Sequence, residues 1–162
     1  MDTFISNSPE QTFGLGRRWA AELQPGWVVG LIGDLGSGKT QLVKGIAAGL
    51  GIPATVTSPT FALLQEHDDG TLPLAHIDLY RLESQQEIVG AGLEHYLTTP
   101  DCVTAAEWFE RWIGRDWQPG QLLPEPAKPA DGQVLRLVHL ACLLYTSPSP
   151  RDRTRSRMPS SA

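Results

Sequence analysis

The sequence predicts a three-layer α/β domain, in which a mainly parallel central sheet with antiparallel additions carries helices on both faces. Short apolar segments bounded by turn residues alternate along the chain with segments of helical periodicity. A glycine-rich turn joins one such apolar segment to one such helix. The 162 residues, 41% of them hydrophobic and 19% charged, suit one compact domain, to which we assign residues 1–141.

The N-terminal third is expected to contain a helix, a buried strand and a second helix. Residues 8–11, Ser-Pro-Glu-Gln, suit an N-cap, a first helical position and a capping box. Residues 27–32 are apolar and bounded by glycine, which predicts a buried strand. The spacing of apolar residues from Lys39 onward predicts a helix that is capped at Gly51.

The remainder of the domain is expected to add strands and shorter helices. The predicted elements are strands at 61–66 and 74–78 joined by a hairpin turn at 68–70, a helix at 84–97, a strand at 103–106, a helix at 108–114 and a strand at 133–140. We expect the hairpin and the last strand to be the antiparallel additions to the sheet.

The charge of the chain argues against a general nucleic-acid binder. The net charge is −5, and residues 1–141 hold nine basic and 17 acidic side chains, a net charge of −8. Binding to phosphate backbones needs clustered Lys and Arg instead. No window approaches the roughly 18 to 20 apolar residues of a membrane span, and the N-terminus lacks a secretory pattern. We therefore expect a cytoplasmic protein with no membrane partner.

Residues 142–162 have Ser, Pro and Arg in place of apolar periodicity, which predicts a disordered tail. Its arginines would suit a basic RNA-binding arm. The string also resembles translated sequencing-adapter read-through at the end of metagenomic gene models. We therefore interpret this tail as non-native, with the native C-terminus lost, and assign it no function.

Residues 33–40, Gly-Asp-Leu-Gly-Ser-Gly-Lys-Thr, match the phosphate-binding pattern G-x-x-x-x-G-K-[ST] without a mismatch. Glycines let consecutive backbone N–H groups turn inward around phosphate oxygens, and the following helix adds its positive dipole end. Lys39 would neutralise the β- and γ-phosphates, and the Thr40 hydroxyl would ligate Mg²⁺. Asn7 is the single asparagine, so the Asn-Lys-x-Asp guanine reader is absent and ATP is favoured. This pattern predicts a P-loop NTPase domain.

Phosphoryl chemistry also requires carboxylates near the metal, usually at the ends of strands beside the phosphate loop. Asp78 ends one predicted strand and Glu107 ends another. Either could instead be a solvated acid at a strand end. Spacing alone does not decide which of the two would be the direct metal ligand.

Together these residues resemble the bacterial TsaE family of tRNA threonylcarbamoyladenosine biosynthesis proteins, which are small P-loop ATPases. The loop at 33–40 is similar to the GDLGxGKT of the family. Residues 57–61 resemble its TSPTF segment, residues 76–81 its HxDLYR, and residues 107–108 its closing EW. Thr12 matches a threonine of the N-terminal helix, so the resemblance covers about residues 3–115.

The resemblance implies a role for each matching residue. Thr60 would sense the terminal phosphate, and Asp78 would act near the metal or the attacking water. The implied catalytic residues are Asp78, Glu107 and Thr60; the metal ligands Thr40, Glu107 and Asp78; and the nucleotide-binding residues Thr12, Gly33, Asp34, Leu35, Gly36, Ser37, Gly38, Lys39, Thr40, Gln41 and Trp108.

The resemblance also implies a function. Family members bind and hydrolyse ATP with Mg²⁺ and support turnover by the partner proteins TsaD and TsaB, which form N6-threonylcarbamoyladenosine at position 37 of tRNA. The family does not transfer the threonylcarbamoyl group itself, and its contact with tRNA would be indirect.

Two other functions remain compatible with a phosphate loop. A small-molecule kinase would need an acceptor pocket and usually an Arg-bearing lid, for which only Arg111 and Arg115 are available. A regulatory switch would bind ATP without useful turnover. Individual roles also stay open: His76 could pack structurally or orient the site, Arg81 could be an arginine finger or a surface contact, and Trp108 could pack in the core or stack on a base.

Overall fold

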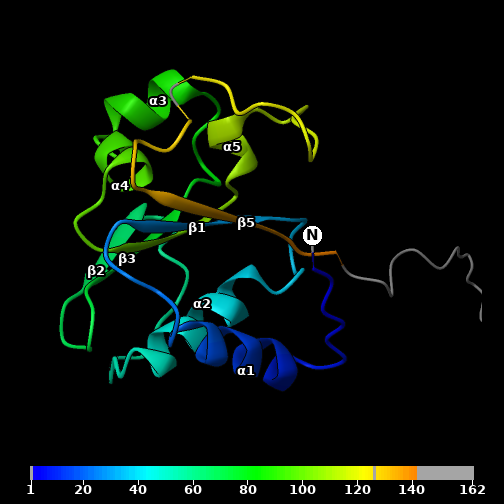
Figure 1. The fold of residues 1–162 in the computed structure, drawn as a ribbon, viewed down its shortest axis with the longest axis vertical. Coiled ribbons are helices and arrows are strands. Elements are labelled where there is room, and N and C mark those ends of the chain that lie inside the picture. The colour runs from blue at the N-terminus through cyan, green and yellow to red at the C-terminus, as the bar shows by residue number, and fades with distance from the viewer. Residues whose placement is uncertain (1, 126, 142–162) are drawn as a thin grey trace, which may run out of the picture.

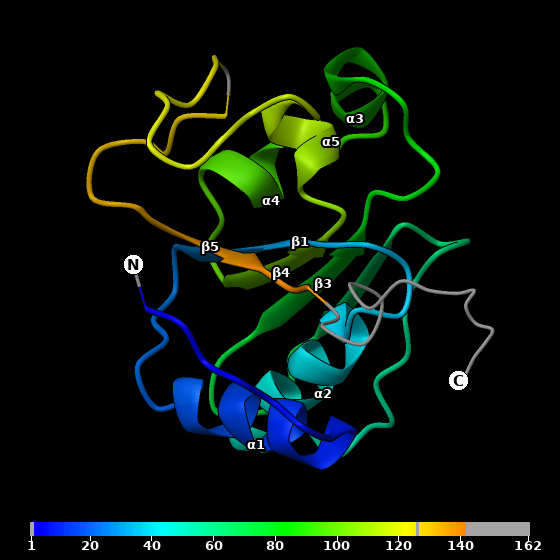
Figure 2. The same ribbon diagram turned by 90° about the vertical axis from the view of Figure 1, so that its right-hand side faces the viewer.

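The computed structural model describes residues 2–125 and 127–141. The helices are α1 (Pro9–Trp19), α2 (Lys39–Gly49), α3 (Gln85–Gly90), α4 (Glu94–Thr98) and α5 (Glu110–Ile113), and the strands are β1 (Trp27–Ile32), β2 (Leu64–His67), β3 (Leu74–Asp78), β4 (Val103–Glu107) and β5 (Val134–His139). The strands form one sheet in the order β2-β3-β4-β1-β5. Helices α1 and α2 cover one face, and α3, α4 and α5 cover the other (Figure 1, Figure 2). This is the predicted three-layer α/β architecture.

The centre of the sheet is parallel, which brings the carboxyl ends of three strands to one edge. Strand β1 pairs in parallel with β4, and β4 pairs in parallel with β3. Only glycine fits at position 30 in β1, since a Cβ there would lie 2.5 Å from the ring of Phe109. In the register of this parallel sheet, Leu31 is opposite Glu107, and Glu107 is opposite Asp78.

Helices α1 and α2 approach each other closely because glycines line their contact. A Cβ on Gly16 would lie 2.3 Å from the carbonyl oxygen of Leu42, and a Cβ on Gly45 would lie 2.1 Å from that of Phe13. The Ser8 side chain caps α1 by accepting from the backbone N–H of Gln11. This packing holds the first turns of α1 beside the start of α2.

The direction predicted for the last strand is wrong. Strand β5 pairs with β1 in parallel, from Trp27 opposite Val134 to Ile32 opposite His139. The chain after α5 runs back across the helical layer before β5 begins, so this strand enters the sheet at the same end as β1 (Figure 2). Antiparallel pairing occurs in the described residues only between β2 and β3, which confirms the hairpin.

Three predicted boundaries are also wrong. The strand predicted at 61–66 begins at Leu64, because a turn closed by the N–H of Leu63 on the carbonyl of Pro59 precedes it. The hairpin connection is longer than predicted and runs from residue 68 to residue 73. The helix predicted at 84–97 divides into α3 and α4 at Gly92, whose φ of +78° interrupts a helix.

The last helical segment is shorter than predicted. Helix α5 begins at Glu110 rather than at residue 108, since Trp108 has a φ of +60°. Phe109 and Trp112 are fully buried and pack in the core of this layer. The predicted tail, residues 142–162, lies outside the described residues. Among the helices that the structure describes, none combines the length and apolar character needed to cross a bilayer.

Candidate functional site

The loop at 33–38 connects the end of β1 to the start of α2, as the pattern predicts. Gly36 and Gly38 have φ angles of +78° and +105°, which glycine adopts without strain. A Cβ on Gly33 would lie 2.3 Å from the carbonyl oxygen of Leu140, and the N–H of Leu140 donates to Ile32 at 2.7 Å. The chain that follows β5 therefore closes one side of the loop.

Lys39 is buried inside this loop, with 5% of its surface exposed. Its Nζ donates to the carbonyl oxygens of Gly33 at 2.6 Å and Asp34 at 2.7 Å. Burial lowers the pKa of Lys39 below the 10.5 of an ordinary lysine, and nearby carboxylates, Glu107 first among them, oppose this effect. The cation is thus held by the loop in the place where the motif requires it.

Thr40 and Glu107 meet although they are 67 residues apart in the chain. The Thr40 hydroxyl donates to Oε2 of Glu107 at 2.7 Å, and Nε2 of His76 lies 2.8 Å from Oε1 of the same carboxylate. His76 and Glu107 are both buried, and Nδ1 of His76 has no hydrogen-bond partner among the described residues. His76 therefore both packs in the core and orients a predicted site residue.

Asp78, on the neighbouring strand, has a separate set of partners. Its Oδ2 accepts from the hydroxyl of Ser58 and, at 3.0 Å, from the hydroxyl of Thr60. Its Oδ1 accepts from the backbone N–H of Tyr80 at 2.8 Å. The segment that precedes β2 is thereby tied to the end of β3.

Trp108 covers the buried lysine. Its ring centre lies 3.9 Å from Nζ of Lys39, within the range of a cation–π contact, and 4.9 Å from the ring centre of Tyr80. The positive φ of Trp108 turns its side chain back from the end of β4 toward the loop. Trp108 is half-buried: it packs against the hydrophobic core on this side of the sheet and also forms one wall of the site.

The other predicted residues lie around the same loop. A Cβ on Gly38 would lie 3.6 Å from Cγ2 of Thr12, which places the first turns of α1 against the loop. Gln41 belongs to the first turn of α2, and Leu35 projects from the loop with 80% of its surface exposed. Asp34 contributes its backbone carbonyl to Lys39. All the predicted site residues therefore gather at one edge of the sheet.

Two residues near the carboxylates of the site, Ser58 and Glu110, were missing from the prediction. Ser58 lies within the TSPTF segment, but only the fold shows that its hydroxyl reaches Asp78. Glu110 follows Glu107 by three residues and has a buried Oε2 without a hydrogen-bond partner in the described residues. Burial raises the pKa of Glu110, partly offset by the backbone N–H groups of Glu110 and Gly33 and by the charge of Lys39. Its spacing from Glu107 was the one available signal.

Comparisons with known proteins identify the family of this chain. A family model described as threonylcarbamoyl adenosine biosynthesis protein TsaE matches residues 6–127, which include every predicted site residue. A tRNA threonylcarbamoyladenosine biosynthesis protein TsaE of Bacillus subtilis is 49% identical over 89 residues, 55% of this chain and 55% of its own length. The protein of the same name from a Nostoc species is 45% identical over 105 residues, 63% of this chain and 64% of its own.

A solved structure is also similar. The crystal structure of Bacillus subtilis YdiB is 37% identical, with a TM-score of 0.55 over 70% of this chain and 67% of its own. The matched regions span between about half and two thirds of these relatives' lengths. The family match covers most of the described domain and contains the phosphate loop, both strand-end carboxylates and the tryptophan that covers the lysine. This chain belongs to the TsaE family of threonylcarbamoyladenosine biosynthesis proteins.

Proposed function

We propose that this protein binds ATP with Mg²⁺ and hydrolyses it to ADP and phosphate, as a component of the tRNA N6-threonylcarbamoyladenosine modification machinery. The observation that carries the proposal is the contact of the Thr40 hydroxyl with Glu107 beside the buried Lys39. A phosphate loop, its hydroxyl and a strand-end carboxylate are the parts that phosphoryl transfer requires. The family to which the chain belongs supplies the pathway.

The donor set suits a magnesium ion. Mg²⁺ prefers oxygen ligands and is usually held by one or two protein groups together with phosphates and water. Thr40 and Glu107 would hold the ion, and their oxygens already lie 2.7 Å apart. When bound, Mg²⁺ supplies positive charge against the terminal phosphates. We favour Glu107 over Asp78 as the direct ligand because Asp78 makes no hydrogen bond with Thr40 and instead accepts from Ser58, Thr60 and Tyr80.

The other site residues would bind the phosphates, position the attacking water and orient Glu107. Lys39 would exchange the carbonyls of Gly33 and Asp34 for phosphate oxygens, which are stronger acceptors for an ammonium group. Asp78 would accept a hydrogen bond from the attacking water, and Thr60 would respond to the terminal phosphate. Water adds to the γ-phosphorus as the bond to the ADP oxygen breaks. His76 would keep the Glu107 carboxylate in its orientation.

We further propose that the activity serves the protein partners TsaD and TsaB in the cytoplasm and that contact with tRNA is indirect. The net charge of −8 over residues 1–141 supports a component that acts through proteins, because it has too few cations for a phosphate backbone. A kinase is not favoured, since Arg111 and Arg115 pair with Glu83 instead of extending over the phosphate loop.

The test compares phosphate release by the full chain with and without TsaD and TsaB. Wild-type protein should release phosphate from ATP, and Lys39→Ala should abolish or sharply weaken ATP binding in titration calorimetry. Lys44→Ala, which removes the same charge five residues further along α2, is the matched control and should bind ATP normally. Phosphate transfer only to a small-molecule acceptor would favour the kinase, and binding without release under any condition would favour the switch.

A further inference from the structure

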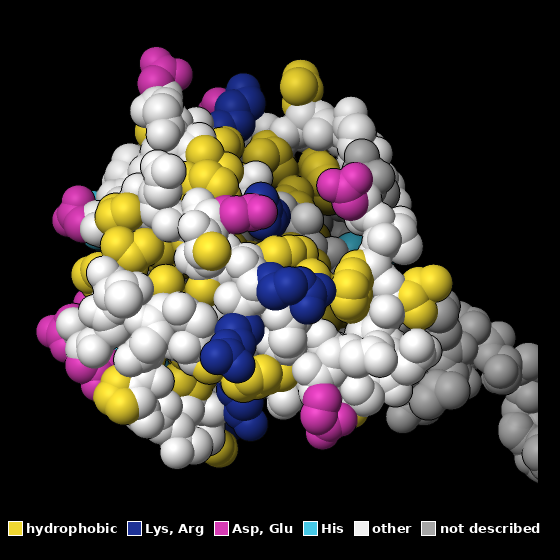
Figure 3. All heavy atoms as spheres, turned by 60° about the horizontal axis from the view of Figure 1, so that its bottom comes forward, with side chains coloured by type: hydrophobic (Ala, Val, Ile, Leu, Met, Phe, Trp, Pro, Cys, Tyr) yellow, Lys and Arg dark blue, Asp and Glu magenta, His cyan; other side chains and the backbone are white. Residues whose placement is uncertain are grey.

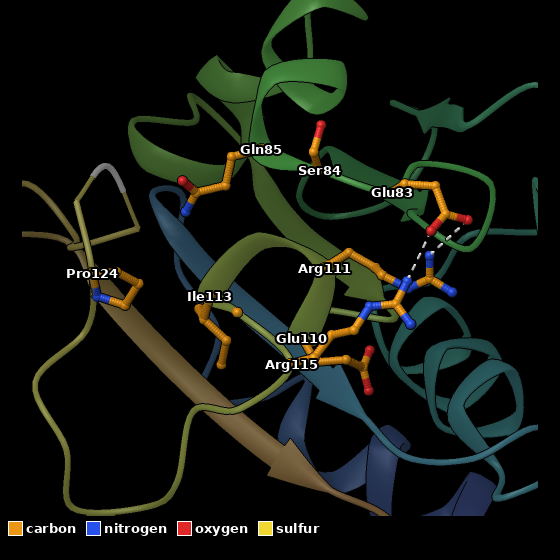
Figure 4. Close-up of a pocket in the computed structure, with 9 residues that line it drawn as sticks. Glu83, Ser84, Gln85, Glu110, Arg111, Ile113, Arg115 and Pro124 are labelled. Carbon is orange, nitrogen blue, oxygen red and sulfur yellow. Dashed lines mark hydrogen bonds and ion pairs between the residues drawn. The ribbon is translucent and has the colours of Figure 1, made fainter.

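A cavity of about 410 Å³ lies between the start of α3, helix α5 and the chain that follows α5. Its volume is in the range of small-molecule sites. Figure 4 shows the side chains that line it, among them Glu83, Gln85, Glu110, Arg111, Arg115 and Pro124. None of these residues has a place in the proposed hydrolysis of ATP.

Arg111 is a largely buried cation whose ion pair with Glu83 is long. Its side chain is 9% exposed, and Nη1 donates to the carbonyl oxygen of Leu82 at 2.9 Å, which fixes its orientation. The closest carboxylate oxygen within ion-pair range, on Glu83, is 3.8 Å away, beyond hydrogen-bond distance. Guanidinium has five N–H donors, and a buried charge is costly unless it is paired. In the described residues, Arg111 therefore retains capacity for an oxyanion.

Glu83 is a weakly held partner of both arginines. Arg115 Nη2 lies 3.2 Å from Oε1 of Glu83, while Arg111 faces Oε2 (Figure 4). The Glu83 and Arg115 side chains are 71% and 56% exposed. Exposed ion pairs of this kind contribute only about 0.2–1 kcal/mol. Another carboxylate could therefore take the place of Glu83.

The cavity adjoins the nucleotide site, and Glu110 on its wall also reaches the backbone of Gly33 in the phosphate loop. The guanidinium carbon of Arg111 lies 5.7 Å from the ring centre of Tyr80 and 5.9 Å from that of Trp108. Nζ of Lys39 lies 3.9 Å from the same Trp108 ring centre. Trp108 is thus within cation–π range of both cations.

We propose that this cavity binds a small carboxylate ligand, whose carboxylate replaces that of Glu83 between Arg111 and Arg115. A carboxylate is favoured over phosphate because the group that now bridges the two arginines, on Glu83, is itself a carboxylate. The two oxygens of a planar carboxylate can accept two parallel N–H bonds from one guanidinium group.

The proposal is tested by titrating the full chain with acetate, succinate and inorganic phosphate in a calorimeter. Succinate should bind saturably, and Glu83→Gln should tighten its binding about two- to fivefold, because an ion pair of up to about 1 kcal/mol no longer competes. Asp68→Asn is the control: it removes the same charge from an exposed residue at the opposite end of β3 and should change nothing. Arg111→Lys should weaken binding, since an ammonium group lacks the planar fork.

Three outcomes would overturn the proposal: no saturable binding of either carboxylate, equal affinities of Glu83→Gln and wild type, or preferential binding of phosphate. Lys39→Ala should leave succinate binding intact. That variant distinguishes a failure of this proposal from a failure of the proposed ATP site, because it affects only the latter.

Discussion

Replacing Glu107 with alanine should both destabilise the protein and stop ATP hydrolysis. The carboxylate is 2% exposed and carries two hydrogen bonds, from Thr40 at 2.7 Å and with His76 at 2.8 Å. In Glu107→Ala the fully buried His76 would have neither ring nitrogen paired, since Nδ1 already has no partner in the described residues. The half-buried Thr40 can turn toward water and loses less.

The magnitude follows from these contacts. An unsatisfied buried polar group costs about 1–3 kcal/mol, and with the lost Thr40 bond and the space left by the side chain we expect roughly 2–4 kcal/mol in total. For a domain of this size that lowers the melting temperature by about 5–15 °C. Hydrolysis should fall further than ATP affinity, because Lys39 and the loop still hold the phosphates.

Glu107→Gln separates stability from chemistry. The amide keeps the side-chain volume, its oxygen can accept from Thr40 and its NH₂ can donate to His76, so the free energy of unfolding should stay within about 1 kcal/mol of wild type. Hydrolysis should still fall roughly tenfold or more, because the negative charge is gone. Glu125→Ala, at a carboxylate whose side chain is 74% exposed, should behave as wild type in both respects.

Thermal melting by circular dichroism, calorimetric titration with ATP and phosphate release measure the three quantities. Equal melting temperatures of Glu107→Ala and wild type would refute the buried network around this carboxylate. Unchanged turnover by Glu107→Gln would remove Glu107 from the catalytic residues.

Three further predictions concern protonation and backbone packing. Burial lowers the pKa of Lys39, so this lysine should lose its charge at a lower pH than an ordinary lysine, whose pKa is 10.5. ATP affinity measured by calorimetry should therefore decline as the pH rises toward 10.5. Constant affinity up to that pH would contradict the assignment. Burial raises the pKa of Glu110 above 4.5, so its protonated form adds stability that is present below pH 4.5 and is lost as pH rises through the raised pKa. Glu110→Gln should flatten the thermal stability profile over that window, and an unaltered slope would argue against it. Gly16→Ala, whose Cβ would meet the Leu42 carbonyl at 2.3 Å, should lower the free energy of unfolding in urea by roughly 1–3 kcal/mol, whereas Gly14→Ala has only a flexible side chain at 3.7 Å and should not.

Elements specified by neighbouring residues were predictable. The predicted strands at 27–32 and 74–78 match β1 and β3, and the helix predicted from Lys39 is α2. The capped end predicted at Gly51 also holds, since this residue has a φ of +74°. In each case an apolar run or a helical spacing lies between glycine, proline or capping residues, so local backbone preferences suffice.

Elements whose form depends on distant contacts were not predictable. The alternation of residues 133–140 indicates a strand, but its direction depends on where the preceding chain returns to the sheet. Leu63 and Trp108 adopt positive φ angles, of +67° and +60°, that side-chain type does not favour. Both side chains pack against the hydrophobic core formed with α3, α4 and α5, a contact that depends on the tertiary fold.

The sequence alone determined the phosphate loop and its place between a strand and a helix, because the motif is contiguous and its glycines have a local role. It also placed Asp78 and Glu107 at strand ends. Only the tertiary structure decided that Glu107 meets Thr40 and His76, that Asp78 is held by Ser58 and Thr60, and that Arg111 and Arg115 share Glu83 beside a cavity. The side-chain hydrogen bonds of the two carboxylates join residues 18 to 67 positions apart. They follow from strand order and register, which no local pattern encodes.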